Sequence, residues 1–167
     1  GRVYAAFAGN TPNGIDGIWT SPNGEGNWVK IAGSDAATNP TGWNAQGRAV
    51  LSIAPSNERY VYVLYDNGTN SNCEETAAPE ADLWRWDQMT TTWTDYSSKL
   101  PDEEGCLEGN DPLAIQGGYD LVVSVKPDNH KYVTIGGTNA YRIADITTDA
   151  MFSRIGGYSS STRYGLY

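Results

Sequence analysis

Hydrophobic and polar positions in this chain form short β-type runs, and the same order of runs occurs three times. Each set opens with an apolar run rich in β-branched and aromatic residues, and two short strands with aromatic residues follow it. The predicted strands of the three sets are 3–7, 17–20 and 27–31; 61–65, 82–85 and 92–96; and 133–135, 139–142 and 151–155. Because short runs of this composition bounded by turn residues are typical of strands, each set predicts one antiparallel sheet.

The aromatic residues of the last two strands in each set have a nearly constant spacing. The pairs are Trp19 and Trp28, nine residues apart; Trp84 and Trp93, also nine; and Tyr141 and Phe152, eleven. Self-similarity of this kind indicates a repeat architecture, and four-stranded units with an aromatic signature are typical of propeller blades. The chain is therefore predicted to be all-β and built from blades of a β-propeller.

The second and third sets have an additional leading strand, at 48–53 and 120–125. Each leads into a turn of similar sequence, with Pro55 and Pro127 lying 72 residues apart. The strand count is then three, four and four, and 163–167 resembles the start of a further leading strand. We expect about three four-stranded antiparallel blades, cut within blades at both ends. The predicted parts are an incomplete blade at 1–32, blades at 48–96 and 120–156, and the beginning of another at 163–167.

A propeller loses its open sheet edges only by closing a ring, typically of four or more blades. Three units cannot close, so the remaining blades of the same protein are the first predicted partner. The chain has no initiator Met and no signal peptide, which is expected of an excised or mature piece.

Composition excludes several classes of function. With 19 Gly and 8 Pro among 167 residues, the chain has the make-up of short strands and tight turns, and no window has a helical stripe of apolar residues. No run approaches the roughly 18 apolar residues of a membrane span. The net charge of −9 argues against a nucleic-acid partner, because phosphate binding relies on Lys and Arg.

Residues 21–28, Ser-Pro-Asn-Gly-Glu-Gly-Asn-Trp, resemble the Asp-box turn, Ser-x-Asp-Gly-Gly-x-Thr-Trp. Ser21, Gly24 and Trp28 match the motif, while Asn23 stands in place of its Asp. Together with the strand-turn spacing, this makes the chain similar to the Asp-box (BNR-like) propellers of sortilin-type receptors, xyloglucanase-type hydrolases and large secreted surface proteins of Bacteroidetes type. The resemblance implies a secreted or cell-surface protein. It also implies that these four residues form a structural turn, the active-site role being the alternative.

The two longest predicted loops, 66–81 and 97–119, are expected on one face of the propeller, and each contains one of the two cysteines. We predict a disulfide between Cys73 and Cys106, with two unpaired thiols as the alternative.

The same loops hold acidic residues, for which a Ca²⁺ site or a glycosidase carboxylate is an alternative to a solvated rim. No set of Cys or His residues suits a transition metal, and no resident metal or cofactor is predicted. The acidic residues are Glu74, Glu75, Glu80, Asp102, Glu103, Glu104, Glu108 and Asp111.

Three aromatic residues, Trp43, Tyr119 and Tyr158, lie in segments that lead from one predicted blade to the next. Their rings are candidates for stacking on a sugar or anchoring a peptide, and packing between blades is the alternative. Asp120 opens an innermost strand and is a weak candidate for a catalytic carboxylate. As an acid or base it needs a second carboxylate across a cleft.

The function that these features favour is a ligand-binding scaffold, for a glycan or a protein, that uses its long-loop face. The alternatives are part of a glycoside hydrolase of xyloglucanase-like type and a purely architectural segment of a surface assembly. A sialidase is disfavoured because no cluster of arginines for a sialic carboxylate is recognisable. Since no complete catalytic set is recognisable, the chain itself is expected not to be an enzyme.

Overall fold

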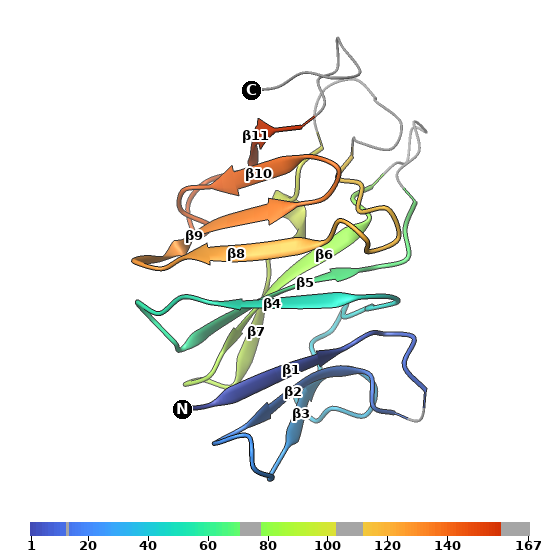
Figure 1. Cartoon of the computed structure of the whole chain (residues 1–167), viewed down its shortest axis with the longest axis vertical. Helices are drawn as coiled ribbons and strands as arrows, with labels where there is room; N and C mark the ends of the chain where they lie inside the picture. The colour runs from blue at the N-terminus through green and yellow to red at the C-terminus, as the bar shows by residue number, and fades with distance from the viewer. Residues whose placement is uncertain (13, 71–77, 103–111, 158–167) are drawn as a thin grey trace.

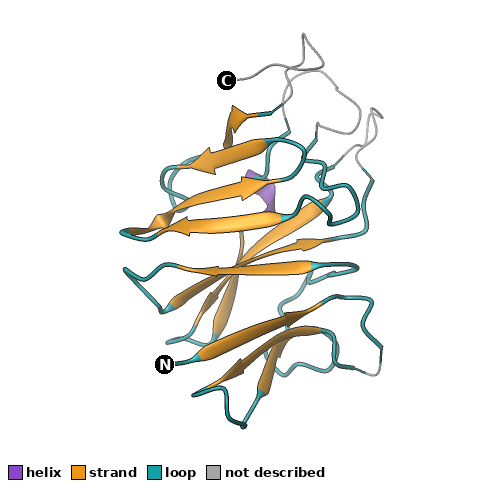
Figure 2. Cartoon of the chain, in the orientation of Figure 1, coloured by secondary structure: helices purple, strands orange, loops and turns teal. Residues whose placement is uncertain are grey.

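The computed structural model describes residues 1–12, 14–70, 78–102 and 112–157. These residues form three antiparallel sheets, and the strands within each sheet lie in chain order (Figures 1 and 2). Sheet 1 contains β1 (Val3–Phe7), β2 (Gly17–Ser21) and β3 (Val29–Ala32). Sheet 2 contains β4 (Ala49–Ile53), β5 (Tyr60–Asp66), β6 (Ala81–Asp87) and β7 (Thr92–Asp95). Sheet 3 contains β8 (Val122–Lys126), β9 (Asn129–Gly136), β10 (Ala140–Ile143) and β11 (Ser153–Gly156).

The all-β class and the succession of three, four and four strands are confirmed. Among the described residues the only helix is a short 3₁₀ turn, η1 (Ser97–Lys99), after β7. The three sheets, over the ranges just given, form neither a closed barrel nor a closed ring. The predicted beginning of a further strand at 163–167 lies outside the described residues.

Most strand ends differ by at most two residues from the sequence prediction, whereas β9 begins at Asn129, four residues before the predicted start at 133. β3 begins at Val29 because Asn27 adopts a left-handed φ of 51° and closes the preceding turn. β8 begins at Val122, since the backbone N–H of Asp120 is still bonded to the carbonyl of Ile115 in a turn (3.2 Å). Such differences leave the pairing of the strands unchanged.

The sheets follow one another along the long axis of the molecule, from sheet 1 in blue to sheet 3 in orange (Figure 1). One apolar core lies between sheets 1 and 2, and a second lies between sheets 2 and 3. Strand β5 supplies both: Val61, Val63 and Tyr65 belong to the first core, whereas Tyr62 and Leu64 belong to the second. All five are fully buried, as expected for a strand covered on both faces of its sheet.

All strands run between the same two ends of the stack, which fixes where the connections lie. At one end, which we call the loop edge, lie the residues 33–48, 67–70, 78–80, 112–121 and 137–139, on the right in Figure 1. The tighter turns 54–59, 88–91 and 127–128 lie at the opposite end, the turn edge. The described part of the chain contains no helix with the length and apolar character needed to cross a membrane.

Candidate functional site

Tyr119 is the most exposed aromatic residue of the loop edge, with 81% of its surface accessible. A tight turn ahead of β8 carries it, in which Gln116, Gly117 and Gly118 have left-handed φ angles of 51°, 64° and 86°. The turn closes through the N–H of Gly118, bonded to the carbonyl of Ile115 (3.0 Å). Glycine suits this path because left-handed backbone is strained for residues with a Cβ.

Arg48, just ahead of β4, fixes the same turn from the neighbouring sheet. Its Nη1 donates to the carbonyl oxygens of Gly118 (3.3 Å) and Tyr119 (3.4 Å). The backbones approach closely here, because a Cβ on Gly118 would lie 3.0 Å from the Cβ of Arg48. Sheets 2 and 3 therefore position the backbone of Tyr119 jointly.

Exposed polar side chains continue from Arg48 along the loop edge. The carbonyl of Asp66 accepts the N–H of Gln46 (2.9 Å), and its carboxylate accepts the N–H of Gly68 (2.8 Å). Gln46 Nε2 donates to Oδ1 of Asn44 (2.7 Å). Asn44, Gln46 and Arg48 are exposed and Asp66 is half-buried, so amide, guanidinium and carboxylate groups line one strip that begins at Tyr119.

A polar network between this strip and the first core supports the strip. The carboxylate of Asp82 accepts hydrogen bonds from the Tyr65 hydroxyl (2.9 Å) and from Asn67 Nδ2 (2.9 Å). The Tyr65 oxygen in turn accepts the indole N–H of Trp84 (3.1 Å) and the backbone N–H of Asn44 (3.0 Å). Burial raises the pKa of Asp82 and that of Tyr65. The network ties the loop edge to the first core and holds the backbone of Asn44 in place.

Trp43 lies beside this network and is half-buried. Its ring packs on Tyr65, Trp93 and Trp84, with centroids 4.5, 5.3 and 6.1 Å apart. The tilted geometry is one that aromatic pairs favour in protein cores. Of the three aromatic candidates, Trp43 thus fills the interface between sheets 1 and 2, Tyr119 is exposed, and Tyr158 lies outside the described residues.

Asp120 follows Tyr119 at the loop edge and is half-buried. The structure therefore places this residue at the loop edge, directly after the turn that carries Tyr119. Cys73 and Cys106 lie outside the described residues, as do all the listed acidic loop residues except Glu80 and Asp102. Glu80 Oε2 accepts the N–H of Ile115 (2.6 Å), so this acidic group supports the segment ahead of Tyr119. Within the described ranges, no group of three or more His, Cys, Asp or Glu residues has the arrangement of a metal site.

The Asp-box-like turn between β2 and β3 is closed by local hydrogen bonds. The Ser21 hydroxyl accepts the N–H of Gly24 (3.0 Å) and donates to the carbonyl of Gly26 (2.5 Å). Oδ1 of Asn23 accepts the N–H of Glu25 (3.2 Å), which is the bond of an Asx turn. Trp28 is not part of these bonds, and 38% of its surface is exposed.

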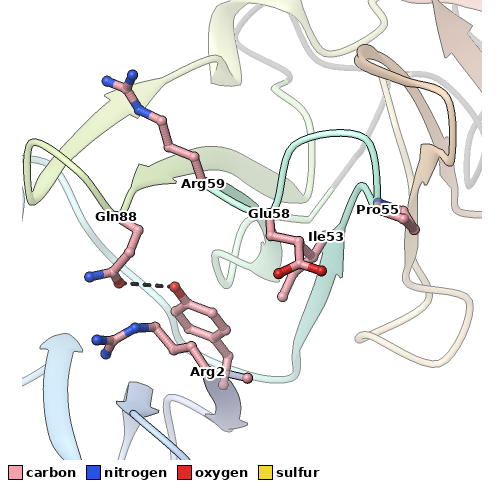
Figure 3. Close-up of a pocket in the computed structure, with 8 residues that line it drawn as sticks. Arg2, Ile53, Pro55, Glu58, Arg59 and Gln88 are labelled. Atoms are coloured by element: carbon pink, nitrogen blue, oxygen red, sulfur yellow. Dashed lines mark hydrogen bonds between the residues drawn. The ribbon is translucent and has the colours of Figure 1, made fainter.

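A hollow at the turn edge was not predicted from the sequence. It is an open cleft of about 500 Å³ between sheets 1 and 2 (Figure 3). Across it, the Tyr4 hydroxyl donates to Oε1 of Gln88 (2.9 Å). Both signs of charge are present, but Arg59 is already paired with Asp87. The lining residues are Gly1, Arg2, Tyr4, Ile53, Pro55, Glu58, Arg59 and Gln88.

Sequence analysis named Tyr119 and Asp120 as candidates but did not name the adjacent polar strip of Asn44, Gln46, Arg48 and Asp66. Their position directly before β4 and at the end of β5 was a usable signal, because both places lie at the loop edge. The contact of Arg48 with the Tyr119 turn joins two segments about 70 residues apart, which local patterns do not encode.

Comparison with known proteins adds no assignment. No protein-family model, no curated protein and no solved structure matches the chain.

Proposed function

We propose that the chain is three successive blades of a β-propeller and that its loop edge binds a neutral carbohydrate. The blade relation is supported by the meander order within each sheet and by the face-to-face stacking of the sheets. It is also supported by the contacts between sheets. The leading strands β4 and β8 of sheets 2 and 3 contact each other. Strand β5 of sheet 2 also contacts β8, and β1 of sheet 1 contacts β4 in the same way. Strand β1 therefore corresponds to β5, the second strand of its sheet.

The exposure of Tyr119 carries the binding proposal. Tyr119 presents a large ring with 81% of its surface accessible to a ligand, on a backbone that a tight turn and Arg48 hold in place. A phenol ring offers a flat apolar face and a polar tip, which is the combination that the alternating C–H and O–H groups of a sugar require. The neighbouring amides of Asn44 and Gln46 supply donors and acceptors for hydroxyl groups.

Charge narrows the class of sugar. The net charge of −9 repels sialylated or sulfated glycans, and the strip itself contains the carboxylate of Asp66. Arg48, the guanidinium beside Tyr119, already donates to two backbone carbonyls. A neutral oligosaccharide fits these surroundings better than an anionic one.

Binding of an array of neutral and sialylated glycans to the purified chain tests the proposal. We expect retention of neutral oligosaccharides, which Tyr119→Ala weakens by about tenfold or more, the equivalent of about 1.4 kcal/mol. Tyr119→Phe keeps the ring and should keep most of the affinity. Met89→Ala, which truncates a 75% exposed side chain at the turn edge, is the matched control and should bind as wild type.

The carbohydrate site is contradicted if no neutral glycan binds, or if Tyr119→Ala binds as tightly as wild type. Either result favours the architectural alternative. If the chain hydrolyses a bound glycan and Asp120→Asn abolishes this hydrolysis, the chain is instead a glycoside hydrolase.

A further inference from the structure

The outer face of sheet 1, opposite to the face that contacts sheet 2, is an uncovered apolar surface. It contains a cleft of about 290 Å³ whose lining is almost wholly apolar. Phe7, Ile15 and Trp28 have 41%, 45% and 38% of their surface exposed. The residues of this cleft, which we call the sheet 1 seat, are Ala5, Phe7, Ile15, Trp19 and Trp28.

The sheet 1 seat has a counterpart on sheet 2 that is covered. Ala5 pairs with Trp19 across β1 and β2, and Val63 pairs with Trp84 across β5 and β6 in the same way. Two positions beyond Ala5 and Val63 stand aromatic residues, Phe7 and Tyr65.

The second aromatic pair continues the correspondence. Trp28 follows Trp19, and Trp93 follows Trp84, at the same distance of nine residues. The seat on sheet 1 therefore repeats the group Val63, Tyr65, Trp84 and Trp93 by register and by spacing.

On sheet 2, this group is covered by sheet 1 and by the segment that joins sheet 1 to β4. Trp43 of that segment packs on Tyr65, Trp84 and Trp93. Sheet 1 adds Ile18, Ile31 and Ala32 to the same core.

Sheet 3 is covered in a similar manner. The aromatic pair Tyr141 and Phe152 is buried in one core with Leu113 and Ile115, which belong to the segment leading into β8. In both cases an apolar side chain ahead of a sheet's leading strand packs in or against the core that holds that sheet's aromatic pair.

We propose that the sheet 1 seat binds a further unit of the same repeat, whose connecting segment places an aromatic side chain on Trp19 and Trp28 as Trp43 is placed on sheet 2. A free glycan is a poor occupant because the cleft offers almost no hydrogen-bonding groups. The free edge of β1 could pair with a strand of such a unit. Among the described residues β1 pairs only with β2, whereas β5 and β9 pair on both sides. The inference rests on the blade relation proposed above and not on the carbohydrate site.

The test is a titration of the whole ¹⁵N-labelled chain with a peptide that copies residues 40–47, observed by NMR at the tryptophan indole N–H signals. We expect saturable shifts at Trp19 and Trp28, and about tenfold weaker binding of the same peptide with Trp43→Ser. Trp28→Ala should remove the response, while Met89→Ala, far from the seat at the turn edge, should leave it unchanged.

Equal shifts with both peptides, or shifts that spare Trp19 and Trp28, overturn the proposal. So does a concentration-dependent dimer in which the seats of two copies cover each other and which Trp28→Ala abolishes, because the occupant is then another seat and not a connecting segment. Glycan binding at Tyr119 is measured separately, so failure here leaves that result intact and the reverse also holds.

Discussion

Single side chains stabilise the turns between strands, and Asp87 is an example. Its Oδ1 accepts the N–H groups of Met89 (2.9 Å) and Thr90 (3.4 Å) and so closes the turn between β6 and β7. Its carboxylate also forms a bidentate pair with the guanidinium of Arg59, although Asp87 is only 9% exposed. The hydrogen bonds from Arg59, aided by those of the turn, hold the pKa of Asp87 well below its usual range.

A depressed pKa in the folded state makes the contribution of Asp87 dependent on pH. The stabilisation is present above the ordinary carboxyl pKa of about 4 and is lost as the pH falls toward the folded-state value. We expect Asp87→Asn to lower the free energy of unfolding by about 2 kcal/mol at pH 7. The difference from wild type should shrink at pH 3 and below, as measured by urea unfolding. Asp128→Asn, which removes an exposed partner of Lys126, is the control and should have little effect at either pH. A pH-independent difference for Asp87→Asn contradicts this role.

At the scale of elements, the sequence predicted the strands well and the connections poorly. The apolar run of β5 and the spaced aromatics of β6 and β7 are local patterns, and each appears where it was expected. The sequence did not decide whether Trp43 is exposed or packed between sheets, because both kinds of aromatic residue look alike in a linker sequence. Its insertion depends on the distance between sheets 1 and 2, which a repeat pattern does not specify.

Trp43 is therefore expected to act as a core residue of the interface between sheets 1 and 2. Trp43→Ala should lower the free energy of unfolding by about 3 kcal/mol, because it leaves a cavity against Tyr65, Trp84 and Trp93. Tyr119→Ala truncates an aromatic residue that is 81% exposed, and it should leave stability close to that of wild type. Urea unfolding of the two variants separates the roles. Equal losses of stability would mean that Tyr119 also packs in the core, and the carbohydrate proposal would lose its main support.

For the whole molecule, the sequence predicted three successive units but not how the units make a surface. The strip of Arg48 and Asp66 next to Tyr119 exists because sheets 2 and 3 bring their leading segments together at one edge. The same stacking leaves the Trp19 and Trp28 face of sheet 1 uncovered. Both surfaces thus follow from one relation between neighbouring sheets.

The measurement that tests this relation most directly is a crystal structure of the chain with a copy of residues 1–58 placed ahead of Gly1. This join gives Val3 the place that Val61 has in the chain. We expect the copied β4 to pair with β1 and the copied Trp43 to pack on Trp19 and Trp28, with the copied sheet related to sheet 1 as sheet 1 is to sheet 2. A copied unit that is unfolded or docked elsewhere, with Trp19 and Trp28 still exposed, would contradict the claim.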